Sequence, residues 1–161
     1  MEDLECKNWC TGSDQSIDFF DIVDLLQEHT LSGAKIFIGS DSFVQNKKIC
    51  FTSAICLHGS NLGSRYFFFK EHVKKNQFLT LAPRITEEVR RSIEIACTLV
   101  DDFQFNTSKI ELHMDVSPTH AGEATSKLSD MLKGYVRGFG IGCKVKPNAW
   151  ASQSIADRHS K

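Results

Sequence analysis

The chain has 161 residues, of which 41% are hydrophobic and 24% are charged. This is the composition of an ordinary globular protein, and it excludes a disordered or low-complexity chain. The 19 Lys and Arg residues nearly balance the 20 Asp and Glu residues. Overall charge therefore indicates no polyanionic partner, and any contact with nucleic acid has to come from a local site.

The sequence carries no sign of a membrane or of export. No apolar run approaches the roughly 18 residues that a membrane-spanning helix needs, and the acidic N-terminus lacks the pattern of a secretory signal. We expect a cytoplasmic protein with reduced cysteines and no membrane partner. Cys6 and Cys10 have no second Cys/His pair at zinc-finger spacing, so they predict no zinc site.

Residues 1–15 are polar, and we expect a flexible N-terminal segment ahead of a single domain over residues 16–161. Hydrophobic periodicity and turn residues then predict nine elements. In chain order these are a helix from Ser16 to about Glu28, strands over 35–41, 49–57 and 64–70, a helix after Pro83, a strand over 109–116, a helix over 123–136, a strand over 141–146 and a helix from Pro147 toward His159.

Short connections between the first three strands predict an antiparallel meander. The later strands alternate with helices, which favours strands parallel to the first. The expected fold is therefore α/β: a five-stranded mixed sheet in the order β-β-β-α-β-α-β-α, with an extra N-terminal helix.

Four acidic residues fall at informative places in this order. Asp41 closes the first predicted strand and Asp115 the fourth, so both should lie at one carboxyl edge of the sheet, where open α/β sheets bind ligands. Glu88 lies at the margin of the apolar stripe of the long helix, and Asp157 lies on the last helix. Converging carboxylates repel one another unless a cation lies between them. Mg²⁺ or Mn²⁺ suits oxygen ligands, and two such ions support phosphodiester cleavage.

Other interpretations of these residues are possible. A lone Asp at a strand end is often a turn former, and a lone Glu on a helix is usually solvated. Ser40 or Ser42 with Asp157 and His159 would suit a serine hydrolase, but the nucleophile turn of that fold leads into a helix and a strand follows here. The glycines at 138–142 follow a helix and precede a strand, the reverse of a dinucleotide loop, so they indicate a helix stop.

The order of elements and the positions of the four acids resemble the ribonuclease H-like superfamily. More specifically, the chain resembles its YkuK-like family of small bacterial proteins over about residues 34–161. The stretches that carry the resemblance are Ile38-Gly39-Ser40-Asp41-Ser42, Arg84-Ile85-Thr86-Glu87-Glu88, Glu111-Leu112-His113-Met114-Asp115, Lys133-Gly134-Tyr135-Val136-Arg137-Gly138 and Lys146-Pro147-Asn148-Ala149-Trp150-Ala151-Ser152, continuing to Ala156-Asp157-Arg158-His159.

The resemblance implies a two-metal site. Asp41 would bridge two Mg²⁺ or Mn²⁺ ions, Glu88 and Asp115 would hold one of them, and Asp157 would complete the second. His159 would assist proton transfer or contact phosphate. The expected contacts to nucleic acid are Ser42, Lys146 and Arg158.

The resulting hypothesis is a metal-dependent nuclease of ribonuclease H type that hydrolyses phosphodiester bonds, with RNA in an RNA/DNA hybrid as the favoured substrate. The site chemistry leaves two alternatives open. One is a DNA exonuclease or a junction resolvase on the same fold. The other is a non-catalytic module that binds nucleic acid or protein.

Overall fold

The computed structural model describes residues 3–117 and 126–161. Its elements in chain order are η1 (Leu4–Cys6), β1 (Cys10–Thr11), α1 (Phe19–Leu31), β2 (Lys35–Gln45), β3 (Lys48–His58), β4 (Arg65–Lys74), η2 (Lys75–Gln77), α2 (Leu81–Asp101), η3 (Thr107–Lys109), β5 (Ile110–His113), α3 (Ser126–Arg137), β6 (Gly142–Lys144), η5 (Ala151–Ala156) and α4 (Asp157–Ser160). The start of the predicted helix at 123–125 lies outside the described residues.

The strands form one mixed sheet in the order β1-β4-β3-β2-β5-β6. The meander β2-β3-β4 is antiparallel, whereas β5 pairs parallel to β2 and β6 parallel to β5. The expected α/β fold with a mixed sheet is confirmed. The sheet has six strands instead of five because the two-residue β1 adds to its edge beside β4.

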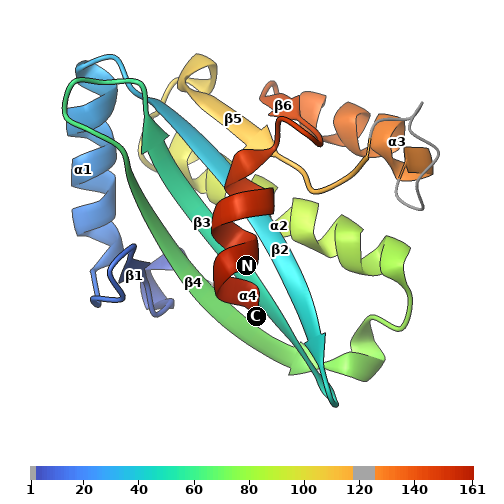
Figure 1. The fold of residues 1–161 in the computed structure, drawn as a ribbon. Coiled ribbons are helices and arrows are strands. Elements are labelled where there is room, and N and C mark those ends of the chain that lie inside the picture. Colours follow the sequence, from blue (N-terminus) through green and yellow to red (C-terminus); the bar gives the residue numbers. More distant parts are fainter. Residues whose placement is uncertain (1–2, 118–125) are drawn as a thin grey trace.

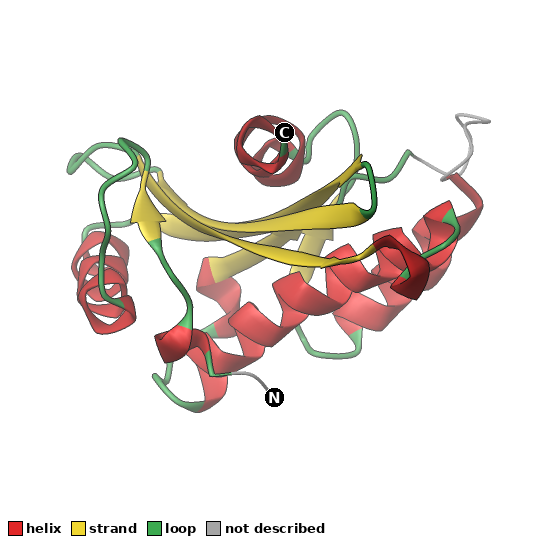
Figure 2. Cartoon of the chain, turned by 90° about the horizontal axis from the view of Figure 1, so that it is seen from below, coloured by secondary structure: helices red, strands yellow, loops and turns green. Residues whose placement is uncertain are grey.

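The sheet is covered unequally on its two faces. Figure 2 shows the three longer helices on one face and the C-terminal helix, η5 followed by α4, on the other. A large apolar core fills the side of the longer helices, with α1 and α2 packed on the strands. A small cluster that includes Ala54, Phe68 and Ala151 lies under the C-terminal helix. The C-terminal helix covers only part of its face, and β2, β3 and β4 run past it (Figure 1).

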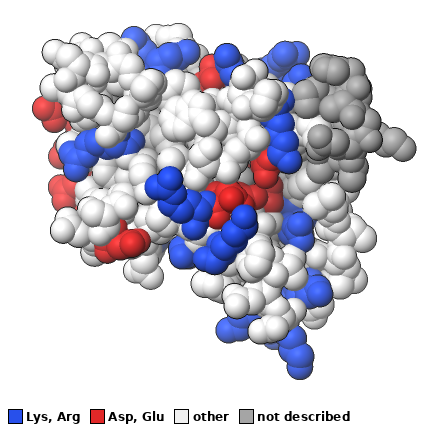
Figure 3. Space-filling view, viewed as in Figure 1, with Lys and Arg blue, Asp and Glu red and all other residues white. Residues whose placement is uncertain are grey.

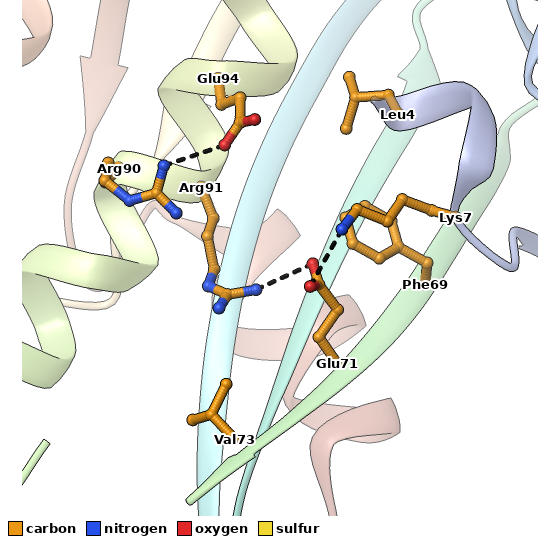
Figure 4. Close-up of a pocket in the computed structure, with 8 residues that line it drawn as sticks. All are labelled: Leu4, Lys7, Phe69, Glu71, Val73, Arg90, Arg91 and Glu94. Atoms are coloured by element: carbon orange, nitrogen blue, oxygen red, sulfur yellow. Dashed lines mark hydrogen bonds and ion pairs between the residues drawn. The ribbon is translucent and has the colours of Figure 1, made fainter. Parts of the chain in front are cut away.

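Residues of the N-terminal segment pack against the rest of the fold. Trp9 is 1% exposed and packs on Phe69, and its indole N–H donates to the carbonyl of Leu4 at 2.9 Å. Lys7 and Arg91 both pair with Glu71 at 3.0 Å, which links this segment to β4 and α2 (Figure 4). The polar composition of residues 1–15 did not reveal that Leu4 and Trp9 are buried, and the burial of such side chains favours an ordered segment. The flexibility of residues 1–15 as a whole stays a prediction.

Several boundaries also differ from the predicted ones. Helix α1 begins three residues after Ser16, because the Asp18 carboxylate caps it by accepting a hydrogen bond from the Phe20 N–H at 2.8 Å. Strand β2 continues to Gln45, so Asp41 lies within the strand and not at its end. The last helix begins after a turn at Pro147, not at Pro147 itself. In the described parts of the chain, no helix is long and apolar enough to cross a membrane.

Candidate active site

Asp41 lies on the face of β2 that the C-terminal helix crosses. Its Oδ2 accepts a hydrogen bond from the hydroxyl of Ser160 at 3.0 Å, although 119 residues separate the two in sequence. Gly39 makes this contact possible. A Cβ at Gly39 would lie 2.5 Å from the backbone N of Ser152 and 2.7 Å from the carbonyl carbon of Ala151. The helix therefore rests directly on the strand backbone, where any other side chain would hold it away.

Glu88 reaches the same site from the opposite side of the sheet. It lies on α2 and is 5% exposed, and the hydroxyl of Ser42 donates a hydrogen bond to its Oε1. Successive side chains on a strand point to opposite faces, so Asp41 points toward the C-terminal helix and Ser42 points toward α2. The parallel ladder of β2 with β5 ends at Gly39 and His113. Beyond that point the described residues place no strand beside β2 on this side, which leaves room for carboxylates from both layers.

Asp115 and Asp157 complete the group, and each forms an ion pair with a lysine. Asp115 lies two residues after β5, and its Oδ1 is 3.1 Å from the Lys146 Nζ. Asp157 begins α4, and its Oδ1 is 3.0 Å from the Lys161 Nζ. In Figure 3, acidic side chains gather near the middle of this face with Lys and Arg side chains around them. The site is thus a set of acids with a basic border.

Burial and neighbouring carboxylates change the ionisation of Asp41 and Glu88. Burial raises the pKa of Asp41 to about 7, and the negative charges of Asp115 and Asp157 add to the rise, while the Ser160 hydrogen bond opposes it. Burial also raises the pKa of Glu88 well above its usual value, with further contributions from the charges of Asp41 and Asp115. Repulsion between buried carboxylates is the electrostatic pattern of a site that gains stability from a bound cation.

A divalent metal fits the chemistry of these donors. All four side chains offer carboxylate oxygen, the ligand that Mg²⁺ and Mn²⁺ prefer. The buried Oδ1 of Asp115 accepts no hydrogen bond of good geometry in the described part of the chain. Across the described residues, no group of three or more His, Cys, Asp or Glu side chains is already arranged to hold a metal ion. The acids therefore match a metal by type and charge, and their side chains would have to move to close around one.

The remaining expected site residues differ in where they lie. Ser42 and Lys146 contact the acids directly, through Glu88 and Asp115. His159 instead turns to β4, where its ring stacks on Phe68 with centroids 3.7 Å apart and its Nε2 lies 3.1 Å from the Tyr66 hydroxyl. None of the contacts described for His159 involves the four acids, so its catalytic role stays a prediction.

Arg158 is exposed on α4, between Asp157 and His159. Its expected contact with nucleic acid also stays a prediction.

Three residues that support the site were not predicted. Gly39 lies in a stretch that carries the family resemblance and Ser160 directly follows another, but their contacts with Ser152 and Asp41 depend on how the helix crosses the strand. His113 is 2% exposed, and its Nδ1 accepts the backbone N–H of Ala151 at 3.0 Å, at the start of the C-terminal helix. The proton must then be on Nε2, which donates to Glu111 Oε1 at 3.0 Å. Burial lowers the pKa of His113 and so favours this neutral form.

Comparison with known proteins agrees with this geometry. The family described as "Ribonuclease H-like" matches residues 19–161, which is most of the chain. The chain belongs to the ribonuclease H-like family. It is 24% identical over 166 residues to the "Uncharacterized protein YkuK" of Bacillus subtilis (strain 168), a match that covers 92% of this chain and 94% of that protein. No solved structure matches. The ribonuclease H-like assignment points to a nuclease-type or nucleic-acid-related function, and the named relative is itself uncharacterised.

Proposed function

We propose that this chain is a divalent-metal-dependent nuclease that hydrolyses phosphodiester bonds, with the RNA strand of an RNA/DNA hybrid as its substrate. One observation carries the proposal: carboxylates from β2, α2, the end of β5 and α4 lie close together. The charges of Asp115 and Asp157 add to the rise that burial causes in the pKa of Asp41, and the charges of Asp41 and Asp115 add to the rise that burial causes in the pKa of Glu88. Family membership supports the nuclease class, and the hybrid substrate is the finer part of the proposal.

The residues of the site would have different roles. Asp41, Glu88, Asp115 and Asp157 would hold Mg²⁺ or Mn²⁺. A bound pair of such ions supplies the positive charge that activates a water and stabilises the leaving oxygen. The hydroxyl of Ser160 orients the carboxylate of Asp41.

Ser42 and Lys146 serve the same site from its edges. The hydroxyl of Ser42 orients the carboxylate of Glu88. Lys146 neutralises Asp115 and would also contact a phosphate of the substrate. Its ammonium group competes with a metal for the same carboxylate, so metal binding would free it for that contact.

Cleavage assays test the proposal. Labelled RNA/DNA hybrid, duplex RNA, single strands and branched DNA are incubated with Mg²⁺, with Mn²⁺ and with EDTA. We expect cleavage of the hybrid with either metal and none with EDTA. Asp41→Asn and Asp115→Asn should each abolish cleavage, whereas Asp24→Asn, an exposed control on α1, should cleave like the natural chain. Cleavage that survives both substitutions at the site refutes the proposal.

One observation favours a second candidate, a non-catalytic nucleic-acid-binding module. Asp115 and Asp157 already have lysine partners, which neutralise them without a metal. Calorimetric titration with Mn²⁺ separates the two functions. A nuclease should bind the metal and lose that binding in Asp41→Asn, whereas a binding module should take up no metal that this substitution affects.

A further inference from the structure

The strands β2, β3 and β4 continue past the C-terminal helix toward the hairpin at residues 45–48. Within residues 3–117 and 126–161, no helix lies over this end of the face (Figure 1). Strand alternation and the pairing register decide which side chains lie here. Asp41 pairs with Thr52, and Thr52 pairs with Lys70, so these three side chains lie on the same face. The residues of this face are therefore the odd-numbered ones of β2 and the even-numbered ones of β3 and β4. The exposed members of this set at the hairpin end of the strands are Phe43, Gln45, Lys48, Lys70, His72 and Lys74.

Charge is segregated between the two faces of these strands. Lys70 and Lys74 lie on the open face with Lys48, and Lys48 pairs directly with Lys74. The acid between them in sequence, Glu71, points to the opposite face, where Arg91 and Lys7 neutralise it (Figure 4). Among the described residues of the three strands, Asp41 is the single acid on the open face. This end of the sheet is therefore cationic although the chain as a whole is slightly acidic.

The cationic surface is continuous with the carboxylate site. Thr52 lies between Asp41 and Lys70 across the sheet, so Lys70 is two strand spacings, or about 10 Å, from Asp41. Phe43 is two residues beyond Asp41 on the same strand, about 7 Å along it. A strand of nucleic acid with one phosphate at the acids would have its neighbouring phosphates and bases over this surface.

An aromatic side chain lies beside the lysines. Phe43 is 37% exposed, and Cys50 separates it across the sheet from His72. Cys50 and His72 also line an open hollow of about 620 Å³ with Lys48 and Gln45. An exposed ring next to a hollow with a basic border offers a stacking surface for a base that has no pairing partner.

We propose that Phe43, Lys48, Lys70, His72 and Lys74, here called the hairpin track, bind a single-stranded stretch of nucleic acid that continues from the bond to be cleaved. The proposal rests on the proposed function for the position of that bond. The lysines contact phosphates and contribute affinity without sequence preference. Phe43 stacks on a base, which selects unpaired nucleotides over duplex.

Fluorescence anisotropy in EDTA tests binding separately from cleavage. The probe is a labelled single-stranded oligonucleotide of about 12 nucleotides, titrated between about 50 and 200 mM salt. Lys70→Gln with Lys74→Gln should weaken binding and lower the steepness of the log–log salt dependence by about 1.4, since each lost phosphate contact removes about 0.7. Lys35→Gln with Lys109→Gln, the same change of charge at the far end of the sheet, should leave binding unchanged.

Phe43→Ala tests the selection for unpaired bases. It should weaken single-strand binding about tenfold and leave a blunt hybrid duplex of equal length unaffected. Phe139→Ala, which removes a ring of similar exposure outside the hairpin track, is the control. The proposal for the hairpin track is wrong if both double lysine variants lose single-strand binding equally. It is also wrong if the Phe43→Ala chain binds the single strand as the natural chain does.

These outcomes are distinguishable from failure of the proposed function. If cleavage depends on Asp41 while the lysine variants bind like the natural chain, the hairpin track is wrong and the nuclease stands. If the lysine and Phe43 variants change single-strand binding as expected but no substrate is cleaved with either metal, the proposed nuclease activity is wrong and the proposed binding surface is supported.

Discussion

Gly39→Ala is the substitution that tests how the site is assembled. The added Cβ would lie 2.5 Å from the backbone N of Ser152 and 2.9 Å from its Cα. Non-bonded heavy atoms settle about 3.5–4.0 Å apart, so the C-terminal helix must move away from β2 by about 1 Å. Both sides of this contact are backbone, and no flexible side-chain end can yield instead.

The displacement reaches the carboxylates through the helix. Ser160 and Asp157 lie on the same C-terminal helix as Ser152, so the 3.0 Å hydrogen bond from Ser160 to Asp41 lengthens beyond bonding range. A shift of this size in a catalytic group costs roughly 100-fold in rate, and overpacking costs about 1–3 kcal/mol of stability. Because burial is the main cause of the raised pKa of Asp41, that pKa should fall from about 7 toward its usual value as the helix lifts.

Three measurements check this reasoning: urea unfolding, the cleavage rate with Mn²⁺, and the pKa of Asp41 by NMR titration. Gly134→Ala is the matched control, because a Cβ at that helical position meets nothing within 4 Å. It should leave cleavage unchanged and stabilise the chain by about 0.5–1 kcal/mol. A Gly39→Ala chain with unchanged stability and with Asp41 still titrating near pH 7 would show that the helix does not rest on this glycine.

Three further outcomes follow from the ionisation and hydrogen bonding of the site. Burial raises the pKa of Asp41 from its ordinary value of 3.8 to about 7, so Asp41 should make the free energy of unfolding without metal fall as the pH rises from about 4 to 7, by at most about 4 kcal/mol. Asp41→Asn should remove this contribution and leave that of Glu88; parallel profiles of the two chains in urea would contradict the raised pKa of Asp41. Mn²⁺ at about 100 times its Kd should stabilise the natural chain by roughly 2.7 kcal/mol at pH 7.5 and leave the melting temperature of Asp41→Asn unchanged. His113→Ala removes the hydrogen-bond partner of the Ala151 N–H and one of the two partners of the Glu111 carboxylate, which also pairs with Lys35. It should lower the free energy of unfolding, measured by thermal unfolding, by about 1–3 kcal/mol. His113→Gln can both accept and donate and should recover part of this loss; equal losses in the two variants would contradict the bridging role of His113.

The sequence was sufficient for the fold class and for the location of the acids. Periodicity in the long helix and alternation in the strands are local properties, so they predicted the elements and their order. They failed at boundaries that distant parts of the chain decide. Strand β2 runs to Gln45 because β3 pairs with it along its full length, and Trp9 near the N-terminus is buried because it packs on Phe69, about sixty residues away.

The candidate site shows the same division. The types and the order of Asp41, Glu88, Asp115 and Asp157 were evident from the chain, because residue identity and the element that a residue belongs to are features of local sequence. The raised pKa values of Asp41 and Glu88 were not, because they depend on distance and burial. Local reasoning also could not place the side chain of His159. Successive residues on a helix point about 100° apart, so Asp157 and His159, two residues apart, point to nearly opposite sides. His159 faces Phe68 while Asp157 lies with the acids.

The sequence by itself determined which chemical groups this protein has and on which elements they lie, since residue identity and local periodicity need no knowledge of distant contacts. The tertiary structure decided what those groups do to one another. It lays the C-terminal helix on Gly39, turns Glu71 away from Lys70 and Lys74, and buries Asp41 among other acids. Electrostatic and packing energies depend on separations in space, and those separations are fixed when the layers come together.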